Sequence, residues 1–181
     1  MSDGQIVLLA LAAVLVFWMV GAYNRLVALR SAIGSAWLLV GEVLAKRGDA
    51  VNALVLALRE PLADEHGALD ALLAADAQIR VAADALRAHP VAAPPAAALV
   101  AAEAAMASAS SRVLALLDQH RELRVDVAVA PHAALIGDSQ ARLIFARQLF
   151  NEAAQAYNAA ARQFPTRLLT RLYGFGTAGR I

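Results

Sequence analysis

The sequence predicts an all-α protein in which an N-terminal transmembrane helix precedes an antiparallel four-helix bundle of long helices. Three observations predict this fold class. The first two dozen residues of the 181-residue chain are almost free of charge. Apolar residues in the remainder recur about every 3.5 positions, the period of helices packed against helices. No segment alternates apolar and polar residues in the manner of a half-buried strand.

The composition excludes several classes of protein. Hydrophobic residues, of which alanine is the most frequent, make up 60% of the chain and charged residues 17%, so a disordered chain is not expected. The absence of cysteine excludes a disulfide-stapled module, a thiol nucleophile and cysteine-ligated zinc or iron–sulfur centres. The net charge of +1 gives no basic field for nucleic acid.

The membrane anchor is predicted at residues 1–23. No residue between Gly4 and Asn24 is charged. The apolar centre, residues 6–22, spans about 25 Å as a helix, and its uncharged flanks extend this to the roughly 30 Å of a bilayer core. The residues predicted to lie in the hydrocarbon are Ile6, Leu9, Leu15, Phe17 and Trp18.

A cleaved signal peptide is the alternative to an anchor. The small residues Val20-Gly21-Ala22 resemble a cleavage site, but no lysine or arginine precedes the apolar stretch. Asp3 lies before that stretch and Arg25 and Arg30 follow it. The positive-inside rule therefore predicts an external N-terminus and a cytoplasmic body in the bacterial inner membrane.

The bundle is predicted over residues 24–165. Its first three helices are predicted at about 23–59, 62–89 and 96–124, and its fourth helix ends at about residue 164. Arg47 interrupts the apolar series before Gly48, where we expect a kink or a solvent-facing turn. Three prolines after the second helix predict a loop. The fourth series has a strict spacing of seven. The apolar seams predicted to form the core are Leu26, Ile33, Trp37, Val40, Leu44, Val51, Leu54, Leu58; Leu69, Leu72, Ile79, Leu86; Leu99, Met106, Val113, Leu117; and Ile136, Leu143, Phe150, Tyr157, Phe164.

The C-terminal tail, residues 166–181, is basic and contains aromatic residues. An up-down-up-down bundle returns this tail to the membrane, where anionic lipid attracts arginine. The candidate membrane-surface contacts are Arg167, Arg171, Tyr173 and Phe175. Pairing of the tail with acidic residues of the bundle is the alternative.

These residues resemble the LemA family of membrane-anchored helical-bundle proteins. The similar motifs begin directly after the anchor and are strongest in the fourth helix, whereas the middle of the chain, including Asp64 and residues 120–126, diverges. The family-motif residues are Tyr23, Asn24, Arg25, Leu26, Trp37, Asn52, Arg147, Phe150, Asn151, Tyr157, Asn158, Phe164 and Pro165.

The resemblance implies a scaffold or interaction module in envelope maintenance, because the family has no agreed enzymatic activity. Some relatives occur beside HtpX-like membrane metallopeptidases, which implies a protein partner of that kind. The magnetosome relative MamQ implies an alternative, membrane shaping through the anchor, the basic tail and self-association as a homo-oligomer. The lipid bilayer is the expected partner in both cases.

No motif predicts a catalytic residue, a cofactor or a metal site. Gly174, Gly176 and Gly179 form a literal G-x-G-x-x-G, but neither a preceding strand nor a following helix is expected, so we interpret it as part of a flexible tail. The histidines lack metal-ligand spacing. Asn24, Asn151 and Asn158 are interpreted as a hydrogen-bond layer that fixes helix register, with a recognition layer as the alternative.

Overall fold

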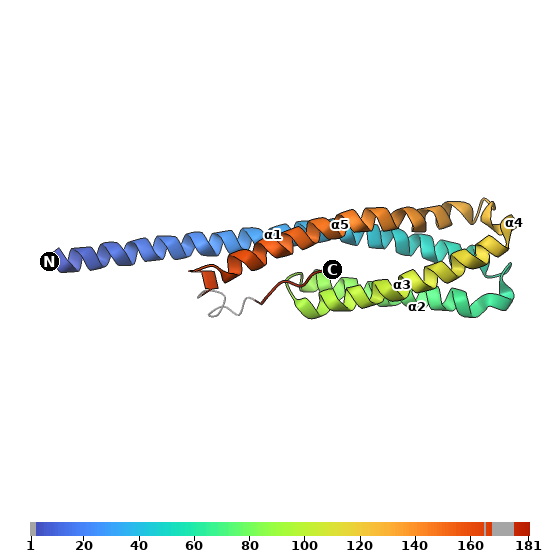
Figure 1. The fold of residues 1–181 in the computed structure, drawn as a ribbon, viewed down its shortest axis with the longest axis horizontal. Coiled ribbons are helices and arrows are strands. Elements are labelled where there is room, and N and C mark those ends of the chain that lie inside the picture. The colour runs from blue at the N-terminus through green and yellow to red at the C-terminus, as the bar shows by residue number, and fades with distance from the viewer. Residues whose placement is uncertain (1–2, 165, 168–175) are drawn as a thin grey trace.

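The computed structural model describes residues 3–164, 166–167 and 176–181, and these residues are predominantly helical (Figure 1). The elements are α1 (Asp3–Leu58), the 3-10 turn η1 (Ala63–Glu65), α2 (His66–Ala88), α3 (Ala93–Gln119), α4 (Arg121–Arg124) and α5 (Ala130–Arg162). No strand occurs within those described ranges. The all-α class and the long apolar N-terminal helix are therefore confirmed.

Helix α1 is one unbroken helix that joins the apolar N-terminal segment to the packed body. Its 56 residues correspond to a length of about 84 Å. The predicted kink or turn at Arg47 and Gly48 is wrong, because both residues are buried within the continuous helix. Gly48 lies against α2, where an added Cβ would stand 2.9 Å from Asp76 Oδ1. A larger side chain there would have to displace the Asp76 carboxylate, which is paired with Arg80.

The helices pack chiefly in two pairs, α1 with α5 and α2 with α3, and α1 also contacts α2 (Figure 1). The colours of Figure 1 show that the members of each pair run in opposite directions. Buried apolar side chains from the four long helices form one cluster. That cluster contains every predicted seam residue except Phe164, which is 70% exposed. Phe164 is exposed because α5 ends at Arg162, before the seam reaches it.

The turns differ from the prediction at two places. Pro94 and Pro95 lie in the first turn of α3 and not in a loop, because proline needs no backbone N–H partner there. The third predicted helix is divided, since α3 ends at Gln119 and the single turn α4 follows. The second helix begins at His66, after a turn at Pro61 and η1.

Candidate functional site: the membrane-facing end and the polar contacts of the body

The apolar end of α1 has no buried residue. The first buried residue of α1 is Leu26. All five predicted anchor residues are exposed: Ile6, Leu9, Leu15, Phe17 and Trp18. An 18-residue window of this helix has a mean hydropathy of 2.5 and is 0% buried, so α1 is long and apolar enough to cross a membrane. Helix α3 also meets that length and hydropathy test, but 39% of its window is buried, as in a core helix.

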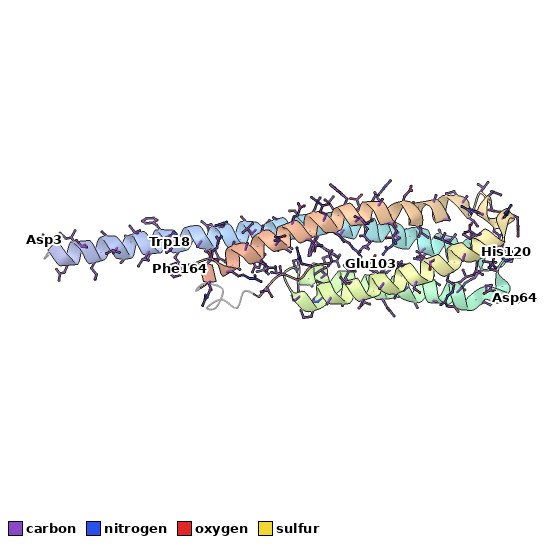
Figure 2. All side chains as sticks on the ribbon, in the orientation of Figure 1. Asp3, Trp18, Asp64, Glu103, His120 and Phe164 are labelled. Atoms are coloured by element: carbon purple, nitrogen blue, oxygen red, sulfur yellow. The ribbon has the colours of Figure 1, made fainter. Side chains whose placement is uncertain are left out.

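The end of α5 returns to the level at which the apolar segment ends. The rings of Trp18 and Phe164 meet edge to face with centroids 5.4 Å apart (Figure 2). About two turns further along α1, Arg25 Nη1 donates to Gln163 Oε1 at 3.3 Å. The amphipathic ring of tryptophan favours the membrane–water interface. The two contacts therefore mark the boundary between the apolar segment and the body.

The predicted membrane-surface contacts fall mostly outside the described residues. Arg167 is exposed and lies three residues after Phe164, which contacts Trp18. Arg171, Tyr173 and Phe175 lie outside the described residues. Their contact with lipid stays a prediction.

A charge network lies inside the body, where α1, α3 and α5 meet. Arg47 of α1 donates through both terminal nitrogens to the Glu103 carboxylate, including Nη1 to Oε2 at 3.1 Å. Arg147 of α5 places Nη2 3.1 Å from the same Oε2. The side chains of Arg47 and Glu103 are 3% and 8% exposed, whereas that of Arg147 is 28% exposed. Such a pair has lost most of its hydration and depends on its partners.

The sequence contained a signal for this network that periodicity alone missed. Arg47 stands within the apolar series of the first helix, and Glu103 stands between the core residues Leu99 and Met106. An acid and a base at core positions of two helices predict a buried ion pair. Glu103 was not among the predicted site residues, although it bonds to Arg147, which was.

The aromatic family-motif residues are core residues. Trp37 and Phe150 are buried and meet edge to face with ring centroids 6.2 Å apart. Tyr157 is buried too, and its hydroxyl donates to Gly176 O at 3.4 Å. Burial raises the pKa of Tyr157 above its ordinary value of 10.0, and the positive charge of Arg30 opposes this rise. Trp37 and Phe150 join α1 to α5, and none of these three buried rings is exposed as a ligand platform.

Two asparagines of α5 hold the residues at the C-terminal end of the chain. Asn158 Nδ2 donates to Ala178 O at 2.9 Å, and Ala178 N donates to Asn158 Oδ1 at 2.8 Å. Asn151 pairs with Ile181 in the same way, at 2.7 and 2.9 Å. We call Asn151 and Asn158 the asparagine clamp and residues 176–181 the tail segment. The clamp bonds the tail segment and no other helix, so the prediction that these asparagines fix helix register is wrong.

The remaining polar family-motif residues take no part in the clamp. Asn24 and Tyr23 are exposed on α1, away from the packed core. Asn52 Nδ2 donates to the carbonyl of Gly48 at 2.7 Å within α1. Pro165 lies outside the described residues. The predicted asparagine layer is therefore divided, because Asn24 takes no part in the bonds that Asn151 and Asn158 make.

The tail segment is also not a free flexible end. Its backbone is held by the clamp, and Ala178 is buried. The expectation that Gly176 and Gly179 belong to a flexible tail is therefore wrong, while Gly174 lies outside the described residues. Among the residues that the structure describes, no three histidine or acidic side chains gather in a way that would hold a metal ion.

An open groove of about 780 Å³ runs between α1 and α5 on the outside of the body. Its apolar lining includes Leu39, Leu135 and Phe145, which are 45%, 41% and 63% exposed. Glu42 and Lys46 form an ion pair at its edge, with Lys46 Nζ 2.6 Å from Glu42 Oε1. The Lys46 ammonium lowers the pKa of the Glu42 carboxyl. We call this the α1–α5 groove.

Comparison with known proteins gives one finding that bears on identity. No curated protein matched the chain. The model of the LemA family matches residues 36–180, which include most of α1 beyond the apolar segment, all the other helices and nearly all of the tail segment. Because this match covers most of the sequence, the chain belongs to the LemA family.

Proposed function

We propose that this protein is a single-pass inner-membrane protein that presents an antiparallel four-helix bundle to the cytoplasm as a scaffold or interaction module. The observation that carries the proposal is the continuity of α1. An exposed apolar segment of about 30 Å passes without a break into a helix that is packed on α5 and α2. Such a helix tethers the body rigidly to the bilayer.

The proposed orientation follows from charge at the two ends of the apolar segment. Asp3 lies at one end, and Arg25 and Arg30 lie at the other, next to the body. Positive residues beside a span favour the cytoplasmic side. The test is the protease sensitivity of a tag placed after Ile181. The tag should resist protease in intact spheroplasts and be cut after detergent is added. Cleavage in intact spheroplasts would contradict the proposed orientation and indicate the opposite one.

The scaffold role, without catalysis by the chain itself, is supported by family membership and by what the described side chains do. The charge network and the clamp are both engaged in holding the chain's own elements together. A protein partner such as an HtpX-like membrane metallopeptidase and self-association are both compatible with a tethered helical body. The α1–α5 groove and the exposed faces of α2 give two surfaces on which partners can be sought.

Site-specific photo-crosslinking in native membranes tests this role. A photoreactive residue at Phe145 probes the α1–α5 groove, and one at Val81, which is 72% exposed, probes the exposed face of α2. A scaffold should give a defined adduct from at least one position, and the adduct should persist after mild detergent extraction. Absence of any adduct, together with turnover of a substrate by the purified protein, would contradict a scaffold role.

Membrane shaping is the second candidate function, and one observation favours it. The contact between Trp18 and Phe164 brings the end of α5 to the apolar segment, and Arg162 and Arg167 are exposed there. Each basic residue near an anionic surface contributes about 1 kcal/mol to binding. The triple variant Arg162→Ala, Arg167→Ala, Arg171→Ala should therefore weaken attachment of the body to anionic liposomes and reduce their curvature.

The matched control for this test removes three arginines from other parts of the body. Arg59, Arg112 and Arg121 are exposed and carry the same total charge. The control triple alanine variant should deform liposomes as the wild-type protein does. Equal deformation by both triple variants would rule out shaping through the basic end.

A further inference from the structure

The tail segment occupies a site built by two helices. The asparagine clamp lies on α5, while Gly179 packs against the start of α3. Figure 1 shows the C-terminus between these two helices. Ile181 packs partly buried against the hydrophobic core. We call the surface that receives the tail segment the tail site.

The spacing of the clamp matches the spacing of an extended peptide. Asn151 and Asn158 are seven residues apart on one helix face, a rise of about 10.5 Å. Their backbone partners, Ile181 and Ala178, are three residues apart, which in an extended chain is about 10 Å. The two distances agree, so one straight helix can bind both positions of one straight peptide.

Each asparagine binds the peptide as a neighbouring β-strand would. Its amide nitrogen donates to the carbonyl of one residue, and its amide oxygen accepts from the N–H of that same residue. This is the two-bond exchange of a hydrogen-bonded antiparallel pair. Main-chain bonds of this kind supply affinity for any extended peptide, and the side-chain pockets supply selectivity.

The selectivity of the tail site resides in four consecutive residues. Ala178 is buried, so a small residue is required there. An added Cβ on Gly179 would stand 2.6 Å from Ala96 Cβ and 2.8 Å from Ala93 Cα, so only glycine fits next. Arg180 is exposed and donates through Nη2 to Gln155 Oε1 at 3.3 Å. Ile181 then places an aliphatic side chain against the core.

We propose that the tail site is a peptide-binding site whose ligand in trans is the tail segment of a second copy of this chain. Every copy carries both the site and a ligand of the sequence small–Gly–x–aliphatic that fits it. The contact within one chain is non-covalent and rests on five hydrogen bonds between α5 side chains and the tail backbone, four in the clamp and one from Tyr157. A tail released from its own site is therefore free to enter another. The tail site does not depend on the proposed function. Exchange between copies does depend on it, because the proposed membrane anchor is what concentrates the copies in one membrane.

The first experiment uses full-length chains in detergent micelles and a fluorescent peptide of residues 176–181. The variant Gly179→Val excludes the chain's own tail and leaves the helical surface of the site intact. The peptide should bind this variant saturably and bind wild-type protein at least tenfold more weakly. The chain's own tail competes at an effective concentration on the order of millimolar. Adding Asn151→Ala and Asn158→Ala to the Gly179→Val chain should abolish binding.

Two controls keep this result decisive. A peptide that carries the Gly179→Val change should not bind, and Ala178→Arg gives a second full-length chain with an excluded tail in case the first fails to fold. Folding is read from helical content and thermal unfolding. A folded variant that does not bind the peptide, or that binds the valine peptide equally well, would overturn the tail site.

The second experiment tests the second copy as the occupant. A tagged Gly179→Val chain has a site without a usable tail, and an untagged Asn151→Ala, Asn158→Ala chain has a tail without a usable site. Reconstituted together in vesicles, the two should be recovered as a mixed pair, and this recovery should be lost when the untagged chain also carries Gly179→Val. Peptide binding without mixed pairs would refute tail exchange between copies and leave the scaffold role of the anchored body untouched.

Discussion

Removal of Glu103 is the perturbation whose effect the structure specifies most sharply. Glu103→Ala deletes the carboxylate to which Arg47 donates, and among the described residues Arg47 Nε has no hydrogen-bond partner even before the change. A 3% exposed guanidinium cannot reach water without opening the packing of α1 on α3. Breaking a buried ion pair by removing one member costs about 3–5 kcal/mol. Arg147, with 28% of its side chain exposed, can turn to solvent and adds little to this cost.

The measurement is the free energy of unfolding of the full chain in mild detergent, from denaturant titration followed by far-ultraviolet circular dichroism. Glu103→Ala should lower it by about 3–5 kcal/mol. The control Glu152→Ala removes an exposed acid and should change it by no more than about 0.5 kcal/mol. The double variant Arg47→Met, Glu103→Leu replaces the buried pair by apolar side chains and should recover most of the loss.

Two results would refute this reasoning about the charge network. A loss below about 1 kcal/mol for Glu103→Ala would mean that Arg47 finds water or another partner. A double variant as unstable as the single one would mean that the cavity left by the side chain, and not the unpaired charge, causes the loss.

Three further predictions concern packing, pH and membrane insertion. Gly48→Val should lower the thermal midpoint, because the new side chain meets the Asp76 carboxylate of α2, and it should cost about 1–3 kcal/mol of stability. Gly137→Ala has open space around it and should instead stabilise α5 by about 0.5–1 kcal/mol. Because burial raises the pKa of Tyr157, the folded state favours the neutral phenol. Its contribution to stability is therefore complete below about pH 10 and declines as the pH rises through the folded-state pKa. Tyr157→Phe should remove this alkaline decline in a series of unfolding curves. Leu11→Arg should make the free energy of membrane insertion about 2.5–3.5 kcal/mol less favourable, so that protein is released by carbonate extraction. Leu56→Arg, at an exposed position of the body, should not change either quantity.

The parts of the fold that could be predicted from the sequence are those with a repeating local signal. A buried helix face repeats every three or four residues, so the seams from Leu26 to Tyr157 identified the core residues correctly. The exposed apolar segment was also predictable from a local signal. An uncharged apolar stretch of this length is typical of a membrane span and rare elsewhere in proteins. Phe164 was the exception, because the seven-residue spacing continues past the residue at which α5 ends.

The parts that could not be predicted depend on contacts between residues far apart in the chain. Arg47 looked like an interruption because its partner Glu103 lies 56 positions away. The asparagine clamp joins residues 20 and 30 positions apart through a side chain and a backbone, a contact that leaves no periodic trace. Pro94 and Pro95 are compatible both with a loop and with a first helical turn, and only the packing of α3 decides between them.

The unbroken course of α1 has a mechanical consequence. About 36 residues of this helix lie beyond the apolar segment, a lever arm of about 54 Å. Because α1 is continuous between the lever and the apolar rod that we propose crosses the bilayer, a ten-degree tilt of the rod would sweep the far tip sideways by about 9 Å. Changes in bilayer thickness, to which single spans respond by tilting, would thus be amplified into displacement of the distal turns.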